Sequence, residues 1–469
     1  MNDEQNVSRR SLLKNSGAAA LAMTMPVSVA RAMYAAEDPR AAAADAAKEA
    51  KKSDKVRIAW IGSGTQGRND LSKLVRMPNV EIVAIADIFD PNRELGLKMA
   101  GPQCQGYSDY RKMLERKDID GVGIATPLYL HAPMAIDVLE SGKNVYVEKL
   151  MAYTVEDAKK MARTAERTGK IMQIGHQRRY SVDYHHALDL LAKKQYFGEI
   201  TQVRAEWNRR NNWRRPLPKD HAGWSEKDLD KLLNWRLYKE RSRGLMAELG
   251  SHQIDVSNWF MGQYAANVAA KAGTPMPPAN RTDLHPVAVV GLGGINYWKD
   301  GREVNDNVQV VFEYPTGQKL IYQSIETNQY LGFSETFMGR NGTLVTSEEK
   351  GRSMMFREPG VEEFGFEKYS DNKTKSNGKE AIVLDAGATT KQDKRQGAGG
   401  QALAGSTGDA ATKDNWYLAL EDWVDCIRTN RAPFCDHRIG MADVACVIAA
   451  NEAMEKGKRV VIPDTAFHL

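Results

Sequence analysis

The stretch VRIAWIGSGTQG, residues 56–67, decides the fold. Its first six residues form an apolar, β-rich run, and three glycines then follow in the spacing G-x-G-x-x-G. A helical stretch reaches about residue 76, and a second apolar run, Val80 to Ala86, stops at Asp87. Strand, glycine turn, helix, strand and acid in this order predict a βαβ unit that binds a dinucleotide.

Each glycine of the turn has a separate task in such a unit. The first allows a tight turn, the second lets the backbone approach a pyrophosphate, and the third lets the helix pack close to the strand. Asp87 is expected to bind the ribose hydroxyls and to repel a 2′-phosphate, which favours NAD over NADP. The cofactor-binding candidates in the turn are Gly62, Gly64, Thr65, Gln66 and Gly67.

Two further strands place polar residues at the same edge of the predicted sheet. Residues 121–125 end at Thr126-Pro127, with His131 opening the next helix, and residues 144–147 end at Glu148-Lys149. Ligands bind at the carboxyl ends of strands in open α/β sheets, so we expect all five residues to contact the cofactor. Lys149 is placed to contact a substrate hydroxyl as well, with a surface ion pair as the alternative.

The pattern changes after residue 180. Longer β runs at 200–207, 304–314, 319–326 and 342–346 predict an open, largely antiparallel sheet backed by helices, chiefly around 248–261. Residues 366–415 are rich in Gly, Lys, Ala, Thr and Asp and predict a mobile insertion. The fold class is therefore α/β, with a Rossmann domain over 55–180 and an α+β substrate and oligomerisation domain over 181–469.

The second domain supplies candidates for proton transfer and substrate binding. Glu248 and His252 are four residues apart, so they share one face of a helix, where the acid is expected to orient the imidazole. A helix-start histidine with a capping role is the alternative. Residues at predicted strand ends are candidates for a polar sugar pocket, with surface charge and packing as the alternative: Arg178, Tyr180, Trp207 and Asn208.

The N-terminus predicts export. Residues 8–14 read SRRSLLK, a twin-arginine pattern, and a short alanine-rich apolar run follows. We expect a removable signal over residues 1–35, a linker over 36–54 and a periplasmic mature protein. No other stretch approaches the ~18 apolar residues that a membrane span needs, so no stable membrane insertion is expected.

Composition excludes other classes. A formal net charge of +5, from 65 basic and 60 acidic residues, does not indicate a nucleic-acid partner, although residues 209–215 are locally basic. The four cysteines form no C-x-x-C pair and predict free, mostly buried thiols, and no metal site is predicted. A single disulfide is the alternative if the chain is exported.

From Val56 to the C-terminus, these motifs resemble the glucose–fructose oxidoreductase, inositol dehydrogenase and rhizopine-catabolism (Gfo/Idh/MocA) family. The family's Glu-Lys-Pro motif corresponds to Glu148-Lys149-Leu150, and its Asp-x-x-x-His pair corresponds to Glu248 and His252, so leucine replaces proline and glutamate replaces aspartate. The resemblance implies catalytic roles for Lys149 and His252, with Glu248 in support, and a homo-oligomer, dimer or tetramer, formed through the sheet.

The resemblance and the export signal together imply hydride transfer at a secondary hydroxyl of a sugar or cyclitol, with NAD kept bound because free nucleotide is scarce outside the cytoplasm. An alternative is redox-neutral cleavage of a glycoside through a transient keto-sugar, as in NAD-dependent glycosidases. A non-catalytic sugar-binding protein is a further alternative, against which the intact Lys149 and His252 argue.

Overall fold

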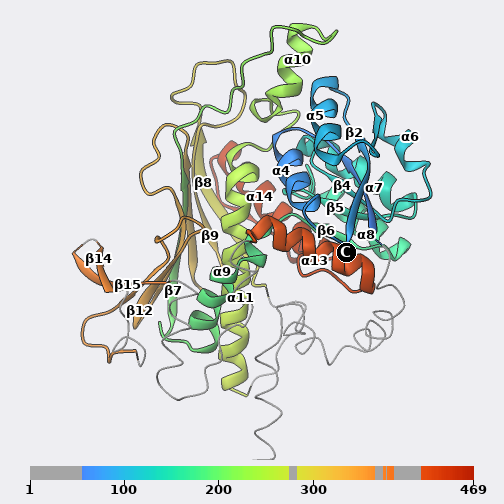
Figure 1. Ribbon diagram of the computed structural model, residues 1–469. Coiled ribbons are helices and arrows are strands. Elements are labelled where there is room, and N and C mark those ends of the chain that lie inside the picture. The colour runs from blue at the N-terminus through green and yellow to red at the C-terminus, as the bar shows by residue number, and fades with distance from the viewer. Residues whose placement is uncertain (1–54, 274–282, 365–372, 377, 385–412) are drawn as a thin grey trace, which may run out of the picture.

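A computed structural model describes residues 55–273, 283–364, 373–376, 378–384 and 413–469. Two sheets, each with helices packed against it, make up these residues (Figure 1). The expected signal and linker, residues 1–54, lie outside the described residues. No helix in the described ranges is long and apolar enough to cross a membrane.

The N-terminal sheet has six parallel strands in the order β3-β2-β1-β4-β5-β6. Helices cover both of its faces, so strands such as β1 and β2 are apolar at almost every position. The strand order reverses between β1 and β4, which is where this topology binds ligands. The strands are β1 (Val56–Ile61), β2 (Val80–Ala86), β3 (Gln105–Tyr107), β4 (Gly121–Ile124), β5 (Asn144–Val147) and β6 (Met172–Ile174). The helices are α4 (Thr65–Leu74), α5 (Asp90–Ala100), α6 (Tyr110–Leu114), α7 (His131–Glu140) and α8 (Val155–Thr168).

The second sheet has ten strands in the order β14-β15-β13-β12-β11-β7-β10-β9-β8-β16. Its neighbours are antiparallel except β7 and β10, which run parallel, so the predicted α/β class with an open, mostly antiparallel sheet is confirmed. The strands are β7 (Ile200–Asn208), β8 (Ala288–Gly294), β9 (Asn307–Glu313), β10 (Lys319–Ile325), β11 (Phe333–Gly339), β12 (Gly342–Thr346), β13 (Met354–Arg357), β14 (Lys373–Ser376), β15 (Lys379–Val383) and β16 (Val460–Val461).

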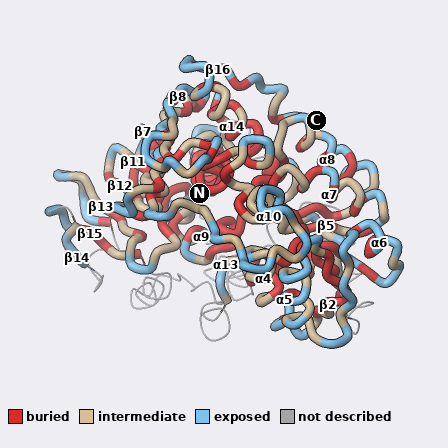
Figure 2. Tube along the Cα trace, turned by 90° about the horizontal axis from the view of Figure 1, so that it is seen from above, coloured by how far each residue is buried: buried red, intermediate tan, exposed pale blue. Residues whose placement is uncertain are grey.

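One face of this sheet packs against two long helices, α11 (Ser251–Lys271) and α14 (His437–Lys456) (Figure 1). Alternate residues of β9 are buried, as expected for a sheet with one covered face. Figure 2 shows the buried residues gathered along the middle of both domains, with exposed residues at the sheet edges and on the outer helices. Shorter helices complete the domain: α9 (Val182–Leu188) and α10 (Glu226–Leu233).

The structure bears on two local predictions, one for residues 366–415 and one for the cysteines. Within residues 366–415, where the composition predicts a loop, β14 and β15 pair as a hairpin at the sheet edge, because backbone pairing there outweighs the polar composition. Most other residues of that stretch lie outside the described residues. None of the four cysteines forms a disulfide, as predicted, and three of them are buried.

Helix α13 (Asn415–Thr429), which precedes α14, packs against the N-terminal domain. Trp423 of this helix is fully buried, with its ring centroid 5.7 Å from that of Tyr146 on β5. Trp60 of β1 lies on the other side of Tyr146, with 6.1 Å between the ring centroids. Residues far beyond position 180 therefore complete the core of the Rossmann domain, so this domain includes a helix from the C-terminal part of the chain.

Candidate active site

The glycine turn after β1 has the geometry of a pyrophosphate cradle. Gly62 has φ +87°, and a Cβ on it would lie 2.7 Å from the carbonyl oxygen of Ala125. A Cβ on Gly67 would lie 1.9 Å from the carbonyl oxygen of Gly62, so the helix start touches the turn. A Cβ on Gly64, by contrast, would meet nothing closer than 4.0 Å. The turn is closed against the protein at two glycines and open at the middle one, which leaves room for a ligand.

The open side of Gly64 faces a cleft that begins at the N-terminus of α4. The first backbone N–H groups of α4 have no side-chain cap, so they are free to bind an anion. Asp87 stands at the end of β2 and also lines the cleft. Its Oδ2 accepts from the backbone N–H of Ser63 at 2.9 Å and its Oδ1 from that of Phe89 at 2.9 Å, while burial raises its pKa. The carboxylate is fixed beside the turn, where an adenosine ribose would bind.

The ends of β4 and β5 form the other wall of the cleft. His131 ties them together, because its Nε2 lies 2.9 Å from the carbonyl oxygen of Thr126 and its Nδ1 lies 2.8 Å from that of Leu150. The hydroxyl of Thr126 is buried in the wall with no hydrogen-bond partner among the described residues. An open cradle, uncapped N–H groups and this orphaned hydroxyl fit a dinucleotide in the cleft. Thr65, Gln66, Pro127 and Glu148 line the same cleft.

Glu148 belongs to a buried acidic group beneath the glycine turn. Its Oε1 lies 3.5 Å from Gln66 Nε2 and 3.3 Å from the hydroxyl of Tyr146. Gln66 also donates to the buried Asp70 at 2.9 Å. Burial raises the pKa of Glu148 to about 7 and that of Asp70 well above its usual range. Both carboxyls therefore favour the neutral form, and Glu148 titrates close to neutral pH.

Lys149 extends from the Rossmann domain to the second domain. Its Nζ donates to the backbone carbonyl oxygen of Glu248 at 2.8 Å, and burial lowers its pKa. The Lys149–Leu150 peptide is cis. The carboxylate of Glu248 accepts from Arg236 Nε at 2.6 Å; burial opposes its charge, but Arg236 and Lys149 together lower its pKa. Lys149 is thus held beside residues of the second domain while it also lines the cleft.

The expected role of Glu248 in orienting His252 is not seen. Residues Met246–Gly250 form a π-helical turn that leads into α11, so the two side chains do not have ordinary α-helical spacing. The acid pairs with Arg236 instead. His252 contacts the ring of Trp207, with centroids 5.5 Å apart, and its buried Nδ1 has no hydrogen-bond partner among the described residues. Burial lowers its pKa well below the usual value, with Lys149 contributing, so the imidazole is neutral.

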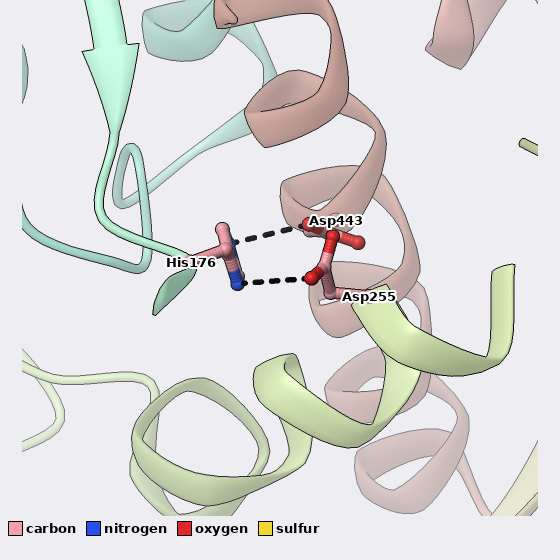
Figure 3. A group of neighbouring side chains, drawn as sticks. All are labelled: His176, Asp255 and Asp443. Carbon is pink, nitrogen blue, oxygen red and sulfur yellow. Dashed lines mark ion pairs between the residues drawn. The ribbon is translucent and has the colours of Figure 1, made fainter. Parts of the chain in front are cut away.

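A buried cluster of His176, Asp255 and Asp443 adjoins His252, and Figure 3 shows the three residues of the cluster. The ring of His176 meets that of His252 edge-on, with centroids 5.9 Å apart. Its Nε2 lies 3.2 Å from Asp443 Oδ2 and its Nδ1 lies 3.8 Å from Asp255 Oδ2, as the dashed lines show. A metal ion would bind through one ring nitrogen, whereas here the two carboxylates divide between both, and Arg179 pairs with Asp255 at 2.6 Å. This arrangement allows the imidazole of His176 to share a proton with the carboxyl groups of Asp255 and Asp443.

The four substrate candidates divide into two groups. Trp207 and Asn208 end β7 as predicted, and Trp207 lies against His252. Arg178 and Tyr180 were expected at a strand end facing a pocket, but they occupy a buried 3₁₀ turn, Gln177–Tyr180, after β6. Arg178 pairs with Glu335 and Glu348, and the Tyr180 hydroxyl accepts from the backbone N–H of Cys435 at 3.2 Å. Their polar groups are used within the protein interior.

The sequence reasoning missed the opposite wall of the cleft. Residues 214–236, here called the roof segment, leave the second sheet after β7 and include α10. Only the basic stretch 209–215 marked this region, and nothing in it indicated a cofactor. Five side chains of the roof segment line the cleft: Arg215, Leu232, Leu233, Trp235 and Arg236. A nucleotide bound in the cleft would therefore contact residues of both domains.

Comparison with protein families gives two adjacent matches. Residues 56–176 match the model of the Gfo/Idh/MocA oxidoreductase family described as an NAD-binding Rossmann fold. Residues 193–462 match the model of its C-terminal alpha/beta domain. Together they span both sheets of the structure.

Two relatives illustrate the sequence similarity. A glycosyl hydrolase family 109 protein of Shewanella baltica is 32% identical over 250 residues, 51% of this chain and 52% of the relative. An alpha-N-acetylgalactosaminidase of Shewanella oneidensis is 33% identical over 218 residues, 44% of this chain and 47% of the relative. The chain thus spans about half the length of the curated relatives it matches.

Solved structures share the fold at low identity. A levoglucosan dehydrogenase in complex with NADH has a TM-score of 0.63 and 16% identity, over 87% of this chain and all of the other. A myo-inositol 2-dehydrogenase from Lactobacillus plantarum has a TM-score of 0.60 and 18% identity, with the same coverage. At this identity the likeness concerns the architecture, which in both cases joins a Rossmann domain to an open sheet.

Proposed function

Because the chain belongs to the Gfo/Idh/MocA family of NAD-dependent oxidoreductases, we propose that it moves hydride at a secondary hydroxyl of a sugar or cyclitol, with NAD retained between turnovers. One observation carries the proposal. Lys149, at the cofactor cleft, donates a hydrogen bond to the backbone of Glu248, four residues before the neutral, unpartnered His252. Lys149 lines the cleft and also lowers the pKa of His252, which supports a cation from one domain acting together with a proton acceptor from the other.

The residues divide the work of moving the hydroxyl proton. NAD, when bound, supplies the hydride acceptor. The neutral imidazole of His252 accepts the proton of the substrate hydroxyl, while the Lys149 ammonium donates a hydrogen bond to its oxygen and stabilises the developing negative charge. Burial keeps His252 uncharged, so its imidazole is free to accept a proton, and burial lowers the pKa of Lys149 toward neutrality.

The walls of the cleft support retention of NAD. Residues of the second domain line it opposite the glycine turn, so the bound nucleotide would have protein on both sides. The twin-arginine pattern at residues 8–14 adds an independent reason. We propose that the enzyme is exported folded, with its cofactor already bound, and acts in the periplasm as a homo-oligomer formed through the open sheet. The exposure of Leu292 on β8, 71%, supports that sheet interface.

A second candidate reaction uses the same residues. The matching relatives named as a glycosyl hydrolase family 109 protein and an alpha-N-acetylgalactosaminidase favour glycoside cleavage without net redox change. Oxidation of a ring hydroxyl acidifies the neighbouring C–H bond, which allows the glycosidic oxygen to leave. Water then adds to the resulting double bond, and return of the hydride restores the hydroxyl. The net reaction consumes one water and releases a sugar and an alcohol.

Product analysis separates the two reactions. The purified protein is first denatured, and the released NAD(H) is quantified; about one nucleotide per chain is expected. The intact protein is then incubated with free sugars, cyclitols and aryl glycosides. A keto-sugar product supports net oxidation, whereas released aglycone with an unoxidised sugar supports redox-neutral cleavage. Lys149→Met should abolish either product, and the exposed Lys194→Met serves as the matched control. Protein that neither contains nor binds NAD would refute both.

A further inference from the structure

Arg215 is the arginine of the roof segment whose guanidinium lacks a protein partner. It lines the same cleft as the glycine turn, and its guanidinium makes no hydrogen bond or ion pair with any described residue. The preceding residue behaves differently. Arg214 pairs with Asp230 at 2.8 Å and donates to the carbonyl oxygen of Asp300 at 2.8 Å. Arg214 therefore stabilises the roof segment through internal contacts, whereas the adjacent Arg215 faces the cleft.

The backbone of Arg215 is held by a buried amide. Asn234, only 1% exposed, accepts from the Arg215 N–H at 2.6 Å and donates to its carbonyl oxygen at 3.1 Å. Asn234 also donates to Asp230 at 2.8 Å, the same carboxylate that receives Arg214. The chain on either side of Arg215 is thus fixed by internal contacts, so its free guanidinium is presented to the cleft by a rigid support.

The charge around Arg215 favours an anion. The charged groups that act on it are Arg236 and Arg68, which repel it, and Glu248, which is already paired with Arg236. Arg68 belongs to the first turns of α4, and Arg215 lines the same cleft as the helix end where the glycine turn leaves room for phosphate. Positive charge therefore approaches one place from the helix N-terminus on one side and from Arg215 on the other.

We propose that Arg215 binds the pyrophosphate of NAD and clamps it against the N-terminus of α4, so that the cofactor leaves only when the roof segment moves. This inference rests on the proposed retention of NAD and identifies the residue that slows its release. A guanidinium can donate two parallel hydrogen bonds to phosphate oxygens, which gives it both strength and direction. Because Arg215 comes from the second domain, the cofactor itself joins the two domains.

The test compares Arg215→Gln with Arg210→Gln, an exposed arginine outside the cleft. Each protein is loaded with NADH, and loss of the bound fluorescence is followed after dilution. We expect release from Arg215→Gln to be about 10- to 100-fold faster, from the strength of a charge-assisted hydrogen bond. Arg215→Lys should recover part of the loss, and Arg210→Gln should match the wild type. Unchanged unfolding temperatures of the cofactor-free proteins exclude a folding defect.

Nucleotide fragments identify the group that Arg215 contacts. Arg215→Gln should weaken binding of ADP and leave binding of adenosine unchanged, because only ADP carries the diphosphate. Wild-type rates of NADH release and wild-type ADP affinity in Arg215→Gln would overturn the clamp while leaving the proposed function intact. Arg215 would then contact either an anionic substrate or no ligand. Rapid NADH loss from the wild-type protein itself would instead refute the proposed retention.

Discussion

Gly64→Ala should weaken NAD binding without weakening the fold. The position has φ −64° and ψ −164°, which alanine adopts without strain, and the nearest atom to the added Cβ is Asn92 Nδ2 at 4.0 Å. No protein atom has to move. Replacing glycine by alanine at a compatible position stabilises a protein by about 0.4–1 kcal/mol, because the unfolded chain loses freedom. The cofactor-free variant should therefore unfold at the same temperature as the wild type or slightly above it.

The cost appears when the nucleotide binds. The open space beside Gly64 is where the pyrophosphate would approach the backbone, so the new methyl group takes up room that the ligand needs. Inserting one methyl group into a packed contact costs about 1–3 kcal/mol. At 1.4 kcal/mol per factor of ten, this corresponds to a loss of NAD affinity of about 5- to 150-fold.

Gly67→Ala supplies the contrast. Its Cβ would lie 1.9 Å from the carbonyl oxygen of Gly62, so the helix has to move away from the turn, and both stability and NAD affinity should fall. The wild type and both variants, each freed of bound cofactor, are compared by thermal unfolding and by fluorescence titration with NADH. Wild-type NADH affinity in Gly64→Ala would refute the placement of the pyrophosphate. A large loss of stability in that variant would refute the claim that the space is empty of protein.

Three further predictions concern other residues. Lys149→Met should lower turnover about 100- to 10,000-fold with its NAD content unchanged, as rate and nucleotide assays will show; wild-type turnover would remove it from the mechanism. Because the folded protein keeps the Glu148 proton up to pH about 7, stability of the cofactor-free protein should fall as pH rises from about 4.5 to about 7. Glu148→Gln should reduce this dependence in thermal unfolding without abolishing it, because burial also raises the pKa of Glu326 and Glu335 to about 7. An unchanged profile would show that Glu148 does not contribute. Arg178→Met leaves Glu335 and Glu348 without their buried partner, so urea unfolding should show a loss of about 3–5 kcal/mol, and a loss below 1 kcal/mol would contradict this role.

The sequence predicts the nucleotide half of the site well because its determinants are local. The glycine spacing and Asp87 lie within about thirty residues, and the alternation of strand and helix fixes which ends share one sheet edge. Each residue chosen there lines the cleft except Gly67, whose place is against the turn. Local pattern was sufficient because the βαβ unit is itself a local structure.

The other half depends on contacts between distant residues. Arg178 meets Glu335, 157 residues later, so its burial cannot be read from its neighbours. Glu248 pairs with Arg236 because a π-helical turn alters the spacing that an α-helix would give. The roof segment reaches the cleft only through the packing of the two domains. In each case the partner of the side chain is set by tertiary structure, which local sequence patterns do not encode.

Isotope transfer tests hydride movement most directly, since both candidate reactions require it. The substrate is a sugar or glycoside that is active in the product assay and carries deuterium at its ring carbons. It is mixed with protein loaded with NAD, and the reaction is quenched early. The mass of the released cofactor is then measured by mass spectrometry. We predict reduced cofactor that carries one deuterium from the substrate, and no label in Lys149→Met. Product formation with a cofactor that never acquires deuterium would contradict hydride transfer and, with it, the role assigned to this site.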